Sequence, residues 1–161
     1  MLKKLLSCAA YLAVIGIVNF FVGRIIPKGW LNADKFPFKS FKFERNGKIY
    51  DALKVKKWQN RVPDMSRLFR KLMPEKKFSK LKEDAVNLMV MISETCIAEL
   101  IHVLLFIEGF GCVFLWKGWG WLVTALYNIF GNVTFIIIQR YNRPRLKACA
   151  AAAERAGLQC A

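Results

Sequence analysis

Histidine is almost absent from this sequence of 161 residues, in which His102 is the only one. A single imidazole excludes a metal site built from several histidines. The five cysteines are odd in number and include no C-x-x-C pair, which argues against a disulfide framework and a zinc ribbon. A glycine-rich phosphate loop, the common mark of a nucleotide cofactor, is missing as well. We therefore expect no bound metal and no bound cofactor.

Acidic residues are also scarce, because 11 Asp and Glu stand against 26 Lys and Arg and leave a formal net charge of +15. At the same time, 55% of the residues are hydrophobic. A soluble domain this apolar is rarely so basic, whereas a membrane protein with a basic face on one side has both properties. The length suits a single domain. The composition therefore indicates a small membrane protein.

Three stretches are long and apolar enough to cross a bilayer, which takes about 20 helical residues. They comprise residues 5–22, 98–116 and 119–138. No small-x-small cleavage site follows the first stretch, which favours an uncleaved anchor over a signal peptide. Lys117-Gly118 leaves only a short turn between the other two, so we expect an antiparallel hairpin. The predicted fold class is an all-α membrane protein with about three transmembrane helices.

These spans divide the chain into four parts. We expect a membrane anchor (1–26), a basic aromatic-rich module (27–83), a helical hairpin with the motif that follows it (84–147) and a tail (148–161). The region from Lys28 to Lys82 holds 17 of the 26 basic residues and only five acids. The positive-inside rule places this module and the tail in the cytoplasm, with the N-terminus and the tryptophan-rich turn outside.

Within the module, Asn46-Gly47 predicts a short β-hairpin between residues 41–44 and 49–50. Further on, Val62-Pro63-Asp64 marks a break before a helix over residues 65–72. Residues 84–97 have a helical pattern that runs on into the second span. The charge alone would allow nucleic-acid binding. No nucleic-acid motif is present, so contact with anionic lipid headgroups or a phosphorylated donor is favoured.

The second span contains ionisable residues. Thr95, Glu99 and His102 are spaced i, i+4, i+7 and share one helix face. Ionisable groups at membrane depth are costly and usually mark function. Glu99 is expected to accept a hydrogen bond from His102, which leaves the other ring nitrogen as a general base. A structural hydrogen bond between two helices explains the pair equally well.

The third span presents carboxamides to one side, namely Asn128, Asn132 and Gln139. Alone, they favour helix packing. In a hairpin that turns at Lys117-Gly118, residues whose numbers add to about 235 lie at equal depth. This register places His102 level with Asn132 or Val133. It predicts one pocket formed by Glu94, Glu99, His102, Asn132, Gln139 and the arginines that follow.

The third span ends in Gln139-Arg140-Tyr141-Asn142-Arg143-Pro144-Arg145-Leu146. Its three arginines suit bidentate binding of phosphate or carboxylate. The alternative is a positive-inside anchor at a helix end, which explains the charge but not the detail of the motif.

Together these residues resemble the bacterial glycosyl-4,4'-diaponeurosporenoate acyltransferase family. The similar stretches are Lys39-Ser40-Phe41-x-Phe43-Glu44-x-x-Gly47-Lys48, Lys57-Trp58, Glu94-Thr95-x-x-Ala98-Glu99-Leu100-x-His102, Asn128, Asn132 and Ile137 to Leu146. The resemblance covers about Ile26 to Leu146, and it departs from the family pattern at Ile97 and Val103.

The resemblance implies an enzyme in staphyloxanthin-type carotenoid biosynthesis. Such an enzyme transfers a fatty acyl group to a sugar hydroxyl, at glucose C6 in the namesake reaction, on a glycolipid such as a glycosylated carotenoid. The donor would be acyl-CoA or acyl carrier protein. The location would be the bacterial plasma membrane, with the active face in the cytoplasm.

We assign catalysis to His102 and Glu99. The predicted substrate-binding residues are Glu94, Asn128, Asn132, Gln139, Arg140, Asn142, Arg143 and Arg145. The expected partners are membrane lipids, the glycolipid acceptor and the acyl donor, with no nucleic acid, and a homo-oligomer stays open. The main alternative is a non-enzymatic membrane scaffold that binds anionic lipid, and a small lipid-modifying methyltransferase or reductase is a further rival.

Overall fold

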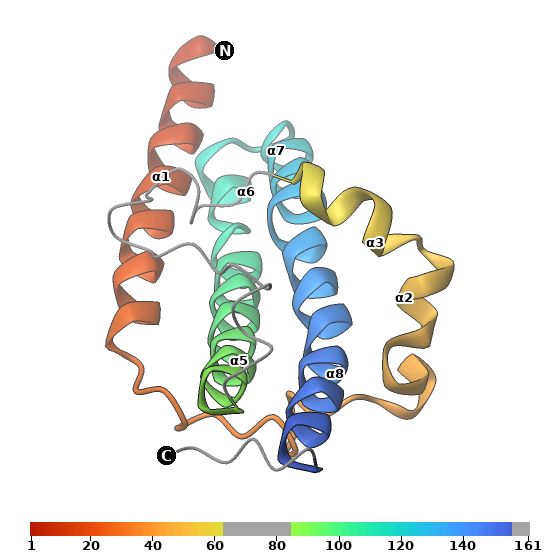
Figure 1. The fold of residues 1–161 in the computed structure, drawn as a ribbon. Helices are drawn as coiled ribbons and strands as arrows, with labels where there is room; N and C mark the ends of the chain where they lie inside the picture. Colours follow the sequence, from red (N-terminus) through yellow and green to blue (C-terminus); the bar gives the residue numbers. More distant parts are fainter. Residues whose placement is uncertain (63–84, 156–161) are drawn as a thin grey trace. The chain divides into compact units, whose positions relative to one another are not determined.

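The computed structural model describes residues 1–62 and 85–155, and every regular element in these two ranges is helical (Figure 1). In chain order the elements are α1 (Leu2–Ile25), the 3₁₀-helix η1 (Lys42–Gly47), α2 (Lys48–Ala52), α3 (Val55–Trp58), the 3₁₀-helix η2 (Gln59–Arg61), α5 (Ala85–Glu108), α6 (Gly111–Leu115), α7 (Gly120–Leu126), the π-helix η4 (Tyr127–Val133) and α8 (Thr134–Arg155).

Three helical stretches are long and apolar enough to cross a membrane, which confirms the predicted all-α membrane fold. They are Leu2–Ile25, Asn87–Leu115 and Gly120–Arg155. The second begins earlier than the predicted residue 98, because residues 88–92 are apolar and belong to the same helix. The third runs past residue 138 because the arginines, lysine and alanines that follow are good helix formers.

The chain forms two compact units. The first, which we call the membrane unit, consists of Met1–Asn32 and Ser93–Gln139. The second, the basic unit, consists of Ala33–Ile92 and Arg140–Ala161, of which residues 63–84 and 156–161 lie outside the described ranges. The predicted helix over residues 65–72 falls in that gap. The predicted helical run over residues 84–97 is confirmed by α5 from Ala85 onward, and residue 84 lies outside the described ranges.

In the membrane unit, α1 lies antiparallel to α5 and α6 (Figure 1). Near its start, the Tyr11 hydroxyl donates to the backbone carbonyl of Glu108 at 2.8 Å. Just past the C-terminal end of α1, Lys28 forms an ion pair with Glu94, which lies well before Glu108 in α5. Between them, Asn19 is buried and its amide donates to the Glu108 carboxylate at 2.6 Å. Polar contacts of this kind hold helices together in a membrane, where apolar burial gives little preference for protein over lipid.

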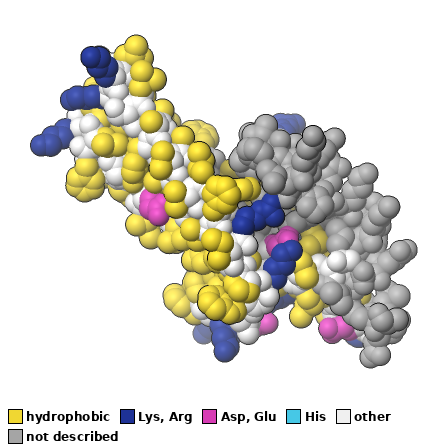
Figure 2. All heavy atoms as spheres, turned by 90° about the vertical axis from the view of Figure 1, so that its left-hand side faces the viewer, with side chains coloured by type: hydrophobic (Ala, Val, Ile, Leu, Met, Phe, Trp, Pro, Cys, Tyr) yellow, Lys and Arg dark blue, Asp and Glu magenta, His cyan; other side chains and the backbone are white. Residues whose placement is uncertain are grey.

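Most of the remaining surface of α1 is apolar. Figure 2 shows hydrophobic side chains over this face, with basic side chains at its N-terminal end. Leu6, Val14, Ile17, Val18 and Phe21 are all more than half exposed. A helix that is apolar on its exposed side is expected to face lipid, as the predicted membrane anchor requires.

The predicted hairpin is confirmed, and its register is close to the expected one. The turn contains Gly118, whose φ of +89° favours glycine. Thr124 donates to the carbonyl of Gly109 at 3.1 Å, one turn further Asn128 donates to the carbonyl of Phe106 at 3.1 Å, and one more turn brings Asn132 to His102. The short turn sets this pairing.

The same hairpin depends on Gly120, where the helices approach closely. A Cβ at this position would lie 2.3 Å from the carbonyl oxygen of Cys112 and 2.8 Å from the Cα of Val113. We expect Gly120→Ala to destabilise the protein by about 1–3 kcal/mol, since the added Cβ clashes with backbone atoms, which cannot rotate away as a side chain would. Gly16→Ala is the control, because a Cβ there meets nothing within 4 Å. Thermal denaturation in detergent measures both, and equal melting temperatures would contradict this account.

The predicted β-hairpin around Asn46-Gly47 is wrong, because these residues join η1 to α2. Gly47 does adopt the left-handed backbone expected of a turn, with φ +89°. However, the Glu44 carboxylate accepts a hydrogen bond from the backbone N–H of Phe41 at 2.7 Å, which caps a helical turn in place of a strand. Gly47 also makes room for Pro144 of α8, whose Cγ would lie 3.2 Å from an added Cβ.

Candidate functional site

The polar centre of the membrane unit lies on the π-helix η4. Asn128 and Asn132 are both in this segment, and their side chains are buried at 4% and 1% exposure. π-Helical turns within longer helices occur often at functional sites. The two asparagines could be identified from the sequence, but the π-helix could not.

A chain of hydrogen bonds sets the orientation of each amide in this centre. The Phe106 carbonyl can only accept, so it takes the amide N–H of Asn128 at 3.1 Å. The oxygen of Asn128 then accepts from the amide of Asn132 at 3.0 Å. The remaining oxygen of Asn132 faces Nδ1 of His102 at 3.2 Å. Because that oxygen can only accept, Nδ1 carries a proton, and in the neutral imidazole Nε2 therefore keeps its lone pair.

The His102 ring is held on a second side by an aromatic contact. It stacks on Phe135 with ring centroids 4.7 Å apart and planes 5° from parallel. The side chain is only half-buried, so its position is fixed without being sealed off. A neutral imidazole with a fixed tautomer and an unprotonated Nε2 is suited to take a proton from a hydroxyl group.

The other predicted residues of this unit are Glu99, Glu94 and Gln139. Glu99 is buried at 4% exposure, and its predicted pairing with His102 stays a prediction. Glu94 forms an ion pair with Lys28, and Gln139 is half-buried on α8. The predicted convergence of these residues with the arginines after Gln139 stays a prediction too. Within the described ranges there is no group of three or more His, Cys, Asp or Glu that could hold a metal.

In the basic unit, Arg140 is committed to a buried ion pair with Glu44. Its Nε lies 2.5 Å from one carboxylate oxygen and its Nη2 lies 3.3 Å from the other. The same guanidinium donates to the backbone carbonyls of Pro37 and Lys39 at 3.3 and 3.2 Å. The side chains of Arg140 and Glu44 are only 9% and 2% exposed. These contacts attach the segment before η1 to α8.

Tyr50 completes this network, since its hydroxyl donates to the Glu44 carboxylate at 2.5 Å. Burial raises the pKa of Glu44, but the hydrogen bonds from Arg140, Tyr50 and the Phe41 backbone outweigh it and leave the pKa below its usual value. Burial and the adjacent carboxylate raise the pKa of Tyr50. The network therefore holds an ionised carboxylate and a neutral phenol at neutral pH.

The other residues of the motif have different surroundings. Arg143 is buried at 3% exposure and donates to the Phe38 carbonyl at 2.6 Å. Arg145 is exposed, lies over the Tyr141 ring at 3.6 Å and pairs with Asp51 at 2.7 Å. Asn142 is half-buried. The three predicted arginines are therefore not equivalent, because the structure gives each a different partner.

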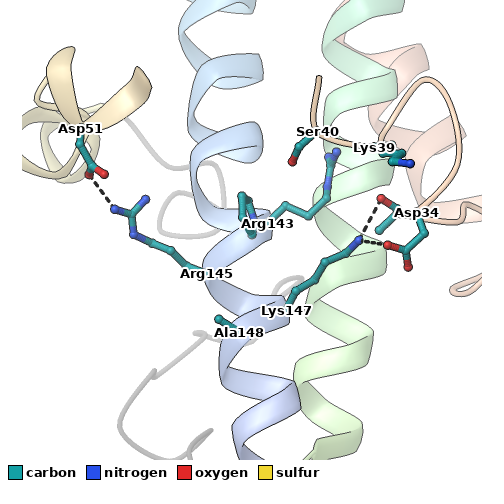
Figure 3. A pocket seen from close by; sticks show the side chains of 10 residues that line it. Asp34, Lys39, Ser40, Asp51, Arg143, Arg145, Lys147 and Ala148 are labelled. Carbon is teal, nitrogen blue, oxygen red and sulfur yellow. Dashed lines mark hydrogen bonds and ion pairs between the residues drawn. The ribbon is translucent and has the colours of Figure 1, made fainter. Parts of the chain in front are cut away.

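Arg143 and Arg145 line a cleft of about 550 Å³ in the basic unit (Figure 3). The full lining consists of Ala33, Asp34, Lys39, Ser40, Asp51, Arg143, Pro144, Arg145, Lys147 and Ala148. Sequence reasoning missed Asp34, Lys39 and Asp51 as members of this site. They come from segments about a hundred residues before the motif, and no spacing rule joins such distant positions.

Comparison with known proteins gives a consistent result. The family model described as "Glycosyl-4,4'-diaponeurosporenoate acyltransferase" matches residues 33–152. Proteins of that name from Staphylococcus aureus strains bovine RF122 / ET3-1, MRSA252 and Newman are each 30% identical over 152 residues, covering 90% of this chain and 87% of the relative. No solved structure matches the chain. The range matched by the family model includes every candidate site residue, from Glu94 to Arg145.

Proposed function

Because the chain belongs to the glycosyl-4,4'-diaponeurosporenoate acyltransferase family and is an acyltransferase, we propose that it moves a fatty acyl group onto a sugar hydroxyl of a membrane glycolipid. The family decides against the non-enzymatic scaffold that the sequence alone left open. The acceptor is a glycosylated carotenoid or a related glycolipid, acylated at glucose C6. The relatives' names support this acceptor, and the membrane-spanning helices suit two substrates with lipid tails.

The observation that carries the mechanism is the chain of hydrogen bonds from the Phe106 carbonyl through Asn128 and Asn132 to Nδ1 of His102, from which the tautomer follows. Its Nε2 takes the proton of the sugar hydroxyl as the oxygen attacks the acyl carbonyl. A carbon–oxygen ester bond forms and the carbon–sulfur bond of the donor thioester breaks. The proton on Nε2 passes to the leaving thiolate, so the products are an ester and a free thiol.

The asparagines act as positioning residues in this scheme. Asn132 uses its oxygen for His102 and its amide for Asn128, and Asn128 is anchored on the Phe106 carbonyl. Glu99 adds a buried carboxylate on the same helix face, which would stabilise the imidazolium formed during transfer. Gln139, which is half-buried, supplies an amide for the sugar, and Glu94 supplies a carboxylate for it. Asn142, in the basic unit, stays a predicted substrate-binding residue.

The donor is acyl-CoA or acyl carrier protein, both of which carry phosphate. Arg143 and Arg145 would bind that phosphate, since they line the cleft, while Arg140 keeps the motif attached to Glu44. We place the basic unit on the cytoplasmic side of a bacterial plasma membrane, where these donors occur. The excess of basic residues between the first and second spans supports this orientation.

A direct assay tests the proposal. The full chain in lipid vesicles receives a long-chain acyl-CoA and a glucosylated carotenoid, and mass spectrometry follows the acceptor. We expect the acceptor to gain one acyl group, and a 6-deoxyglucosyl acceptor to gain none. Acylation of the 6-deoxy acceptor would contradict the C6 assignment, and unchanged acceptors with either donor class would contradict the proposed reaction.

A further inference from the structure

The cleft of the basic unit gathers more positive than negative charge. Four basic side chains line it, against only two carboxylates, which leaves two positive charges in excess; these groups are Lys39, Arg143, Arg145, Lys147, Asp34 and Asp51. A concave site lined mainly by charges of one sign concentrates its field and attracts the opposite charge. The cleft is therefore electrostatically suited to an anion with at least two negative charges.

The two carboxylates are paired with two of the cations. Lys147 Nζ lies 2.5 Å from Asp34 Oδ1, and Arg145 Nη2 lies 2.7 Å from Asp51 Oδ1 (Figure 3). Figure 3 shows that the Arg145 and Lys147 side chains extend in different directions from α8, each toward its own acid. The native acids therefore occupy positions beside the cations that an incoming anion would need.

Exposure distinguishes these pairs from the buried pair of Arg140. Asp34 and Asp51 are 81% and 53% exposed, whereas Glu44 is 2% exposed. Water screens exposed pairs, so they contribute little net stability and can be exchanged at small cost. The carboxylates in the cleft are consequently replaceable, and the one that holds Arg140 is not.

We propose that the cleft binds the phosphate groups of the acyl donor, and that Asp34 and Asp51 are internal counter-ions that these phosphates displace from Lys147 and Arg145. The inference rests on the proposed function for its choice of ligand. Phosphate offers more acceptor oxygens than a carboxylate and matches a guanidinium bidentately. The Ser40 hydroxyl and the Lys39 ammonium add hydrogen-bond donors at the same cleft.

Two kinds of substitution test this proposal, because they are expected to change the affinity for coenzyme A in opposite directions. The full chain in phosphatidylcholine nanodiscs is titrated with coenzyme A by calorimetry. We expect Lys147→Gln and Arg145→Gln to weaken binding about 10-fold each, because each removes a charge-assisted bond. Asp34→Asn and Asp51→Asn are expected to tighten binding about 3-fold, because each removes a competing exposed pair. Weaker binding in the two asparagine variants would overturn the counter-ion role.

A double-variant cycle distinguishes the counter-ion role of Asp34 from a general change in the charge of the cleft. Asp34→Asn should no longer tighten binding in the Lys147→Gln background, because the pair it relieves is already gone. Lys56→Gln is the matched control, since Lys56 is an exposed lysine of the same unit that does not line the cleft. If Lys56→Gln weakened binding as much as Lys147→Gln, the specific site would be overturned. Lys147→Arg keeps the charge and should retain most of the affinity.

The phosphate could belong to coenzyme A, to 4'-phosphopantetheine or to a lipid headgroup. Binding measurements with each of these ligands distinguish them. Coenzyme A should bind more tightly than 4'-phosphopantetheine, which has a single phosphate for a cleft with two exchangeable pairs. If phosphatidylglycerol vesicles bound through Lys147 and Arg145 while coenzyme A did not bind, the donor assignment would be overturned.

Kinetics separate failure of this inference from failure of the proposed function. With both correct, Lys147→Gln raises the KM for the acyl donor and leaves kcat nearly unchanged. If the variants changed coenzyme A binding as expected while no acyl transfer occurred, the site would stand and the proposed reaction would fall. If transfer proceeded while the same variants left binding and KM unaltered, the cleft proposal alone would fall.

Discussion

Replacement of His102 with alanine is expected to slow acyl transfer by about 10²–10⁴-fold, the usual contribution of a positioned general base. The loss should appear in kcat, because the imidazole acts on the proton that moves in the transition state. Coenzyme A affinity should not change, since the cleft of the basic unit does not include this residue. The measurement is single-turnover acyl transfer in vesicles at saturating donor.

His102→Asn is the matched control for folding. An asparagine amide can still donate toward the Asn132 oxygen but has no basic nitrogen. We therefore expect this variant to keep the melting temperature better than His102→Ala while being as inactive. If both variants retained more than half of the wild-type rate, His102 would not be the base, and the polar centre would serve helix packing only.

The hairpin and its polar face could be predicted from sequence because the rules involved are local. A short turn joins two helices, so the approximate level of each residue follows from its distance to the turn. That arithmetic brought His102 level with Asn132 or Val133, and the structure has Nδ1 of His102 3.2 Å from Oδ1 of Asn132. The two apolar segments of the hairpin could be predicted just as directly, because a membrane span is recognised by its length and composition.

The tautomer of His102 could not be predicted in this way. It depends on which end of each carboxamide faces its neighbour, and that choice is set by the Phe106 carbonyl. Main-chain carbonyls exist at every position, so the sequence does not show which one will serve. The π-helix that contains Asn128 and Asn132 could not be predicted either, because its residues show no strong local preference for it.

The different surroundings of the three arginines were also hidden in the sequence. Charge counting treats Arg140, Arg143 and Arg145 as equal members of one basic segment. Only the folded chain shows that Glu44, 96 positions earlier, takes Arg140 into a buried pair. The β-hairpin prediction failed for the same reason, because it ignored the role of Glu44 in capping η1.

This buried pair carries the second large prediction. Arg140→Ala is expected to destabilise the protein by about 3–5 kcal/mol, because it leaves the Glu44 carboxylate buried without its cation. The Tyr50 hydroxyl and the Phe41 backbone N–H still bond to that carboxylate, but they do not neutralise it. Chemical denaturation in detergent micelles, followed by tryptophan fluorescence, would measure the loss.

A double variant shows whether the loss comes from the unpaired charge. Glu44→Gln combined with Arg140→Gln removes both charges at similar volume, so we expect it to recover more than half of the stability lost in Arg140→Ala. Arg145→Ala, which breaks an exposed pair in the same motif, should cost only about 1 kcal/mol.

Equal losses in Arg140→Ala and Arg145→Ala would mean that burial does not distinguish the two arginines. The motif would then have to be treated as a uniform basic anchor. A larger loss in Arg140→Ala would instead support different roles for the two arginines, in which Arg140 stabilises the unit and the exposed Arg145 binds a ligand.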